Sequence, residues 1–251
     1  DMKAGEKFEF TVTEKVEGED KQVSKGTATG GSDGVAADID FDEISYDLDD
    51  VGSHTYTIKE VKGGEDKGLT YSDTKYTVTV SVSDNGDGTL KAEVTGITGS
   101  DGTTSVGFTT TYEPEPITYT PDVTKTVTGN ELPADQTFTF KLAAGTFDPE
   151  DGAEMPADTQ AQIKVEKGKT TGTVTDNDFG EITFKKAGTY TFTITEEKPT
   201  QAGFENYDTS KWTLTVVVSD DGEGTLTRKS TVYTKEGVDD GTAAAFTNAY
   251  D

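Results

Sequence analysis

Short stretches in which polar and apolar residues alternate run through the whole chain. Examples are KFEFTV at 7–12, TYTIKE at 55–60, YTVTVSV at 76–82 and YTFTITE at 190–196. Side chains two positions apart in an extended strand point to the same face, so this period predicts β-strands with one buried face. We therefore predict an all-β protein.

The alternating pattern occurs in two copies. GSHTYTIKE at 52–60 matches GTYTFTITE at 188–196, and residues 71–90 match residues 207–226 at the same offset of 136 positions. FTTTY at 108–112 and FTNAY at 246–250 match in the same way, with a slightly larger offset. Such self-similarity predicts two tandem copies of one domain.

A proline-rich segment, EPEPITYTP at 113–121, lies between the two copies. Proline cannot donate to a sheet ladder and holds the chain extended, so we place the linker here. The predicted domains are residues 1–116 and 117–251.

The first copy begins later in the repeat than the second. DMKAGEKFEF at 1–10 corresponds to ELPADQTFTF at 131–140, so the counterpart of DVTKTVTG at 122–129 would precede residue 1. We expect the first domain to lack its N-terminal strand. The boundary of the fragment is the simpler explanation, and a strand added by another chain is the alternative.

Composition and charge exclude several classes of partner. The formal net charge of −26 opposes binding to nucleic acid or to an anionic membrane, and no apolar run is long enough to span a bilayer. There is no cysteine, so disulfides and thiolate metal sites are ruled out. Any signal peptide or wall anchor is expected to lie outside this fragment.

The acidic residues of the glycine-rich stretches could suggest a calcium loop. Asp84 and Asp87 lie in DNGDGT, and Asp220 and Glu223 in DDGEGT. Glycine occupies alternate ligand positions, however, and the downstream bidentate glutamate is missing, so these stretches are better explained as β-hairpin turns. We expect neither metal nor cofactor.

In three predicted strands of the second copy, one polar residue joins an apolar face. These residues are Lys125 between Val123 and Val127, Glu196 after Tyr190, Phe192 and Ile194, and Asn248 between Phe246 and Tyr250. Singly, the lysine could extend to solvent, the glutamate could be hydrated at a strand end, and the asparagine could bond backbone. Together, an amine, an acid and an amide on inward faces are better explained as mutual partners.

Such a trio can react with itself. Burial lowers the pKa of Lys125 and raises that of Glu196, which leaves a neutral amine beside a neutral acid. The amine can then attack the side-chain carbonyl carbon of Asn248. We expect the protonated Glu196 to hydrogen-bond that carbonyl and to relay protons until ammonia leaves, with an amide between Lys125 and Asn248 as the product.

Four motifs of the second copy resemble the isopeptide-linked domains of Gram-positive pilins and surface adhesins, most closely the streptococcal major-pilin type. They are VTKTVTG at 123–129, GTYTFTITEE at 188–197, YDTSKWTLTVVVSDDGEGTL at 207–226 and FTNAY at 246–250. The resemblance implies two Ig-like (CnaB-like) β-sandwiches and a structural role in a pilus shaft or adhesin stalk. It also implies an extracellular, cell-wall-anchored protein.

The resemblance assigns a role to each reactive residue. Lys125 is the nucleophile, Glu196 the catalytic acid and Asn248 the electrophile. Strand alternation points Glu197 to the opposite face.

The first copy keeps the glutamate but not the reactants. Glu60 matches Glu196, whereas Thr110 stands where Asn248 would be and has no carbonyl to attack. Lys7 lies on the face opposite Phe8 and Phe10, and Lys3 precedes the strand. We expect a degenerate site without a cross-link, in which Thr110 could donate a hydrogen bond to Glu60.

Alternatives remain for the function. The expected partners are neighbouring repeats of the same surface protein, and the competing hypothesis is binding of a host protein or glycan through loops of the first domain. The tripeptide Tyr-Pro-Lys, often used to polymerise pilins, is absent, which favours an adhesin stalk or repeat array. With one histidine, His54, and no nucleophile elbow or phosphate loop, an enzyme acting on an external substrate is disfavoured.

Overall fold

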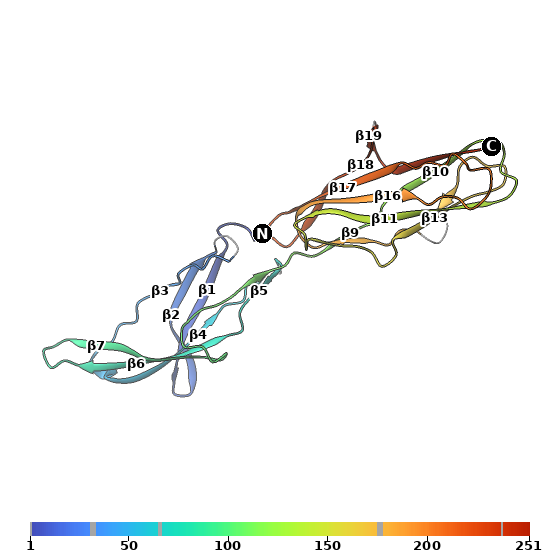
Figure 1. The fold of residues 1–251 in the computed structure, drawn as a ribbon. Helices are drawn as coiled ribbons and strands as arrows, with labels where there is room; N and C mark the ends of the chain where they lie inside the picture. Colours follow the sequence, from blue (N-terminus) through green and yellow to red (C-terminus); the bar gives the residue numbers. More distant parts are fainter. Residues whose placement is uncertain (1, 31–33, 65–66, 175–177, 237) are drawn as a thin grey trace. The chain divides into compact units, whose positions relative to one another are not determined.

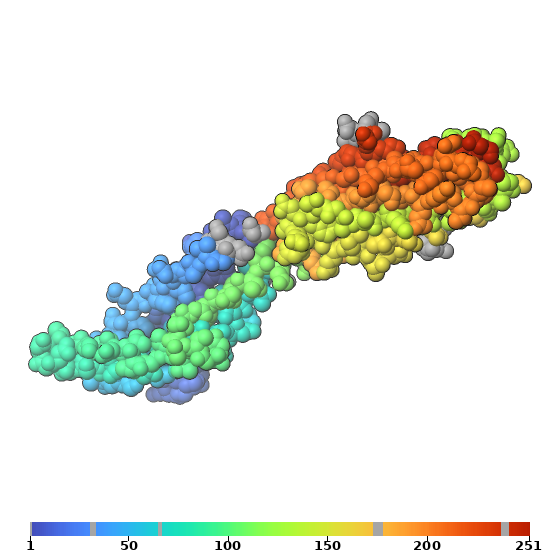
Figure 2. Space-filling view, in the orientation of Figure 1, coloured from blue at the N-terminus to red at the C-terminus, as the bar shows by residue number. Residues whose placement is uncertain are grey.

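The chain folds into two compact units whose regular secondary structure is almost entirely β-strand. The computed structural model describes residues 2–30, 34–64, 67–174, 178–236 and 238–251 (Figure 1). Unit 1 is built on Asp1–Glu113, and unit 2 on Pro114–Asp221 and Thr225–Asp251. Figure 2 shows the surface of unit 1 in blue to green and that of unit 2 in yellow-green to red.

Unit 1 contains one large antiparallel sheet with the strand order β3-β2-β1-β4-β6-β7. Its strands are β1 (Lys7–Val16), β2 (Glu19–Thr29), β3 (Asp40–Phe41), β4 (Gly52–Glu60), β6 (Lys75–Asp84) and β7 (Leu90–Gly99). A two-stranded sheet pairs β5 (Leu69–Thr70) with β8 (Thr111–Tyr112), and a single 3-10 turn, η1, spans Leu48–Asp50. Alternate residues of β1, β4 and β6 are buried, as their period of two predicts.

Unit 2 contains a seven-stranded antiparallel sheet with the order β14-β13-β11-β16-β17-β18-β19. Its strands are β11 (Gln136–Asp148), β13 (Gln160–Val165), β14 (Thr173–Val174), β16 (Gly188–Glu196), β17 (Lys211–Asp220), β18 (Leu226–Lys235) and β19 (Val238–Gly241). A parallel pair joins β10 (Val123–Gly129) to β20 (Ala244–Tyr250). The third sheet, β12-β15-β9, contains β9 (Ile117–Tyr119), β12 (Ala153–Glu154) and β15 (Ile182–Phe184).

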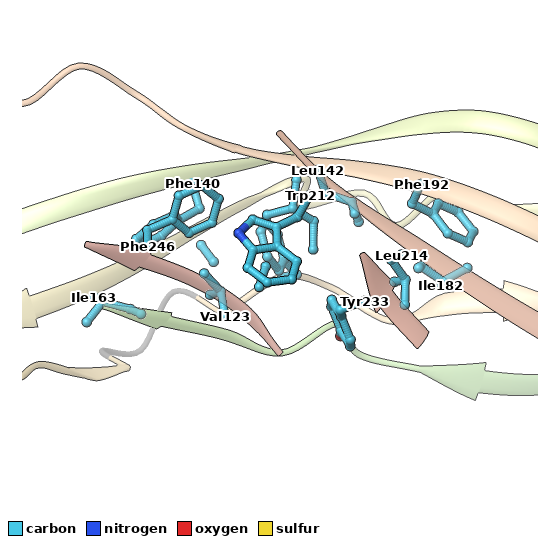
Figure 3. Close-up of a cluster of buried hydrophobic side chains, with 14 of the residues drawn as sticks. Val123, Phe140, Leu142, Ile163, Ile182, Phe192, Trp212, Leu214, Tyr233 and Phe246 are labelled. Atoms are coloured by element: carbon cyan, nitrogen blue, oxygen red, sulfur yellow. The ribbon is translucent and has the colours of Figure 1, made fainter. Parts of the chain in front are cut away.

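The core of unit 2 lies between these sheets (Figure 3). Phe140 of β11 packs against Phe246 of β20, with 5.2 Å between the ring centroids. Trp212 of β17 is buried, and its indole N–H donates to the Ala245 carbonyl at 3.1 Å. Aromatic burial and this hydrogen bond together fix β20 against the large sheet.

The all-β fold of two tandem β-sandwich domains is confirmed. The two large sheets even share a register, since Phe10 pairs with Glu60 in unit 1 and Phe140 pairs with Glu196 in unit 2.

One expectation about the connection between the units was incomplete. Part of the segment 113–121 that we interpreted as a linker is β9, which pairs with β15 of unit 2. Ile117 and Tyr119 pack against the core of that unit, and this burial outweighs the extended-linker tendency of the flanking prolines.

Unit 1 has no strand in the place of β10 among the residues that the structure describes. Phe108 and Thr110 are therefore only half-buried, whereas their counterparts Phe246 and Asn248 are fully buried under β10. The described large apolar side chains that are exposed also all lie in unit 1: Val16, Val35, Phe41, Leu48, Val51 and Val94.

Candidate cross-linking site

The parallel pair β10-β20 brings Lys125 and Asn248 to the interior of unit 2. In its register, Val127 is opposite Asn248 and Lys125 is opposite Phe246, so both polar residues share the inward face. A glycine ends β10 because Gly129 has a φ of 86°, and a Cβ there would collide with the Tyr250 carbonyl oxygen. This close approach of Gly129 to Tyr250 therefore limits how β10 can slide along β20.

Glu196, the last residue of β16, lies between these two side chains. Lys125 Nζ donates to Glu196 Oε2 at 2.8 Å, and Asn248 Nδ2 donates to Glu196 Oε1 at 2.8 Å. The relative exposures are 2% for Lys125, 8% for Glu196 and 0% for Asn248, so water does not compete for these contacts. One carboxyl group thus bridges an amine and an amide in a dry interior.

Burial shifts both ionisable groups toward their neutral forms. It lowers the pKa of Lys125 below its ordinary value, although the hydrogen bond and charge of Glu196 act in the opposite direction. It likewise raises the pKa of Glu196 above its ordinary value, against the effect of Lys125. The Lys125 amine also lies 4.6 Å from the centroid of the Phe138 ring, an apolar neighbour that contributes to its burial.

The oxygen of the Asn248 amide has a different partner from the one we expected. The backbone N–H of Asp208 donates to Asn248 Oδ1 at 2.7 Å. An N–H can donate only to an acceptor, so this contact fixes the amide with its nitrogen toward Glu196. The expectation that Glu196 hydrogen-bonds the carbonyl was wrong, because the backbone of residue 208 already occupies that oxygen.

A family model matches almost the entire chain, at residues 1–113 and 121–251. Its description is the Spy0128-like isopeptide containing domain, FctA. The chain belongs to this family. The two matched stretches correspond to the two copies of the repeat.

Curated and solved relatives of this isopeptide-domain chain include streptococcal pilins. A protein named pilin from Streptococcus pyogenes serotype M1 is 32% identical over 99 residues, which cover 37% of this chain and 29% of that pilin. Among solved structures, a major pilin from S. pyogenes is 17% identical, with 99% of this chain and 92% of that chain covered at a TM-score of 0.36. A second major pilin from the same species is also 17% identical, with coverages of 100% and 91% and a TM-score of 0.36.

In the first isopeptide-family repeat, the two residues that correspond to Glu196 and Asn248, namely Glu60 and Thr110, are in contact. Thr110 Oγ1 donates to Glu60 Oε1 at 2.8 Å, and the Ser72 backbone N–H donates to Glu60 Oε2 at 2.6 Å. Both oxygens of this buried carboxyl group are therefore satisfied locally. No lysine among the described residues of unit 1 is buried, and Lys7 is exposed.

Glu197 lies outside the site of the second family repeat. It is partly exposed and forms a 2.5 Å ion pair with Lys141 on the surface. The choice between the adjacent glutamates thus follows the strand alternation, which buries Glu196 and leaves Glu197 partly exposed.

The acidic glycine-rich stretches of this isopeptide-domain chain form turns. Asp84 Oδ1 accepts from the Gly86 N–H at 2.8 Å, and Asp87 Oδ1 accepts from the Thr89 N–H at 3.0 Å. Across the described ranges, no group of acidic or histidine residues is arranged to hold a metal ion. Within the same ranges, no helix has the length and apolar character needed to cross a membrane.

Proposed function

We propose that unit 2 closes itself with an isopeptide bond between Lys125 and Asn248, with Glu196 as the catalytic residue. The chain would then be a structural module in the shaft of a Gram-positive pilus or in the stalk of a surface adhesin. The observation that carries this proposal is the buried bridge of Glu196 between the nucleophilic and the leaving nitrogen. Membership of the isopeptide-domain family supports it.

The reaction begins with proton transfer inside the buried pair. Because burial favours the neutral forms, Lys125 Nζ gives a proton to Glu196 Oε2. The resulting amine carries a free lone pair and attacks Cγ of Asn248. No external base is needed, since the acceptor of the proton is already 2.8 Å away.

Glu196 also assists the departure of ammonia. Its Oε1 lies 2.8 Å from Nδ2, so the acid can protonate the leaving nitrogen while it recovers a proton from the attacking amine. The Nζ–Cγ bond forms first, and the Cγ–Nδ2 bond then breaks with the loss of one ammonia. Glu196 ends as the protonated acid when neutral ammonia leaves, and it returns to the carboxylate if ammonia carries that proton away as ammonium. The two reactants are consumed, so each molecule reacts only once.

The bond would change how unit 2 carries force. Lys125 and Asn248 lie near opposite ends of the sequence of this unit, so the covalent link closes a loop of nearly the whole domain. Tension applied to the two ends of the chain would pass through the link and not through the hydrogen bonds between strands. An amide also resists reductants, which suits a cysteine-free protein on an extracellular, wall-anchored fibre.

Two observations bear differently on the kind of fibre. The similarity to S. pyogenes pilin supports a pilus shaft, in which neighbouring copies of pilin-like repeats are the partners. The absence of Tyr-Pro-Lys favours a stalk that does not polymerise through that motif. The mechanical role that we propose is the same in both cases.

Single-molecule stretching of the whole chain, held at its two ends, tests this function. We expect unit 1 to unfold and extend fully, while unit 2 does not lengthen between Lys125 and Asn248. The Glu196→Gln variant should show two full-length unfolding steps. Two full-length steps from the unmodified chain would contradict the proposal.

Binding of a host protein or glycan by unit 1 is the second candidate function. The exposed Phe41, Leu48 and Val94 side chains favour it, because unit 2 has no exposed large apolar side chains among its described residues. A glycan and matrix-protein array probed with the full chain tests this candidate. Binding that survives a change in unit 2 but is lost on Leu48→Asp would support it, and absence of binding would oppose it.

A further inference from the structure

The carbonyl oxygen of Asn248 is held by a donor that is not part of the Lys125, Glu196 and Asn248 trio. Both oxygens of Glu196 are occupied by the two nitrogens, which leaves Asn248 Oδ1 to the backbone N–H of Asp208 at 2.7 Å. We propose that this N–H is the oxyanion donor of the cross-linking reaction and that the Asp208 side chain is the positioning group for it. This inference rests on the proposed function.

The position of the N–H matches the place where negative charge develops. When Lys125 Nζ attacks Cγ, the electron pair of the carbonyl double bond moves to Oδ1, which becomes an oxyanion. The carbonyl forms again when the bond to Nδ2 breaks and Nδ2 leaves, protonated by Glu196, as ammonia. A fixed donor about 2.7–3.1 Å from the oxyanion stabilises it without reorganisation, and most strongly in a site without water.

The Asp208 side chain holds its own backbone in place. Its Oδ1 accepts from the Ser210 N–H at 2.9 Å, and its Oδ2 accepts from the Thr247 N–H at 2.9 Å. Asp208 therefore contacts two adjacent residues of β20: its side chain accepts from the Thr247 N–H, and its backbone N–H donates to the Asn248 side chain. Burial raises the pKa of Asp208, but the hydrogen bonds from Ser210 and Thr247 outweigh it and hold that pKa below its usual value.

The same backbone position has a different partner in unit 1. Ser72 corresponds to Asp208, and its N–H donates to Glu60 Oε2 at 2.6 Å. Thr110 offers no carbonyl oxygen there, so the donor binds the carboxyl group itself. The donor is therefore a shared feature of the repeat, and only the unit with the asparagine directs it at an amide oxygen.

Replacing one backbone amide with an ester removes the donor and leaves every side chain in place. Cell-free synthesis with the α-hydroxy analogue of aspartate at residue 208 produces this change in the full chain. Cross-linking is followed by intact mass over time, and folding is followed in parallel by the fluorescence of Trp212, the only tryptophan. We expect a folded ester variant that loses ammonia about 10²–10³-fold more slowly than the wild type.

Matched variants separate this role from general destabilisation. The same ester at the exposed Thr209 should react at the wild-type rate. Asp208→Asn keeps one acceptor oxygen but replaces the other with an NH2 donor, so it can accept from Ser210 or from Thr247 but not from both. It should react at a rate between those of wild type and Asp208→Ala, which loses both acceptors and should be slowest. If the ester variant at residue 208 fails to fold, the rescue by asparagine relative to alanine decides whether the side chain positions the donor.

The outcomes also distinguish this inference from the proposed function. In one outcome, the wild-type chain loses ammonia and the folded ester variant at residue 208 does so at a rate within about threefold of the wild-type rate. This outcome would overturn only the role of the N–H as oxyanion donor, given the effect expected for such donors. Equal rates for Asp208→Asn and Asp208→Ala would overturn the positioning role. A wild-type chain that keeps its full mass would overturn both proposals.

Discussion

Glu196 contacts Lys125 with one carboxyl oxygen and Asn248 with the other, each at 2.8 Å, in the interior of unit 2. The arrangement explains how a proton can leave the nucleophile and reach the leaving group without crossing water. It also makes the glutamate the residue whose loss should stop the reaction while both reactants stay in place.

Glu196→Gln should give a folded chain that keeps its full mass. The amide preserves the shape of the side chain but cannot accept the lysine proton as a carboxylate does. Without the cross-link, unit 2 should lose about 4–5 kcal/mol of stability, the chain-entropy value for a loop near 100 residues. Mass spectrometry and chemical denaturation measure the two effects.

The control for this change is its partly exposed neighbour. Glu197→Gln removes only a surface ion pair with Lys141, so the cross-link should form as in the wild type and stability should change by less than about 1 kcal/mol. A cross-linked Glu196→Gln chain, or an unlinked Glu197→Gln chain, would show that the wrong glutamate was assigned.

Thr110→Asn should not create a cross-link in unit 1. The substitution supplies the missing amide beside Glu60, but no lysine among the described residues of that unit occupies the place of Lys125. The mass of the variant should therefore differ from the wild type only by the substitution. Loss of a second ammonia would contradict this prediction.

Thr110→Val should destabilise unit 1 by about 1 kcal/mol, at the low end of the cost of an unsatisfied buried acceptor. The change removes the hydroxyl that donates to Glu60 Oε1, in a place that is only half-buried. Thr110→Ser should restore the stability, and Thr109→Val, on the exposed face, should have no such cost. Denaturation of the unit 1 transition measures these differences.

His54 should make unit 1 less stable as the pH rises above neutrality. Its Nδ1 contacts Glu14 Oε1 at 2.8 Å and its Nε2 contacts the Asp50 carbonyl at 2.7 Å, so both ring nitrogens face acceptors and the imidazolium is favoured. The Asp50 carbonyl, together with Glu14, raises the pKa of His54. The stabilisation is complete below the unfolded pKa of about 6.5 and is lost as the pH passes through the higher folded pKa.

The single histidine makes this effect easy to isolate. Its imidazole protons in an NMR titration should report the raised pKa directly, and His54→Gln should remove the loss of unit 1 stability above about pH 6.5. An NMR pKa at or below the ordinary value would refute the prediction.

Tyr233→Phe should weaken unit 2 at the entrance to β10. The buried Tyr233 hydroxyl oxygen accepts from the Asp122 N–H at 2.6 Å, and its loss would leave that donor unpaired at a cost of about 1–3 kcal/mol. Tyr119→Phe removes a half-buried hydroxyl that lies 2.8 Å from the Tyr233 hydroxyl and donates to Asp122 Oδ2 at 3.4 Å, and it should cost less because the Asp122 N–H keeps its acceptor. Denaturation in a Glu196→Gln background, where no link masks the change, compares them.

The period of two in the sequence was sufficient to predict the β-fold and the inward faces of Lys125, Glu196 and Asn248, and self-similarity was sufficient to predict the repeat. The period could do so because each strand has one buried face, so a polar residue in the apolar register is conspicuous. The hydrogen bond from the Asp208 N–H to Asn248 could not be predicted from this pattern, because every residue except proline has a backbone N–H. Only the fold decides which N–H reaches the amide.

The parallel pairing of β10 with β20 was likewise not predictable from local pattern. It joins segments from the two ends of the sequence of unit 2, and its register depends on the close approach of Gly129 to Tyr250 and on the packing of Phe246 against Phe140. The strand β9 was missed because its flanking prolines resemble those of a linker, while its burial depends on β15, far along the chain.

The mass of the intact, unmodified chain tests the cross-link most directly. Formation of one bond between Lys125 and Asn248 predicts a mass lower by one ammonia than the sequence requires, with the two residues joined in a single peptide after digestion. Lys125→Ala, Glu196→Ala and Asn248→Ala should each restore the full mass. A wild-type chain at its full sequence mass would contradict the cross-link in unit 2.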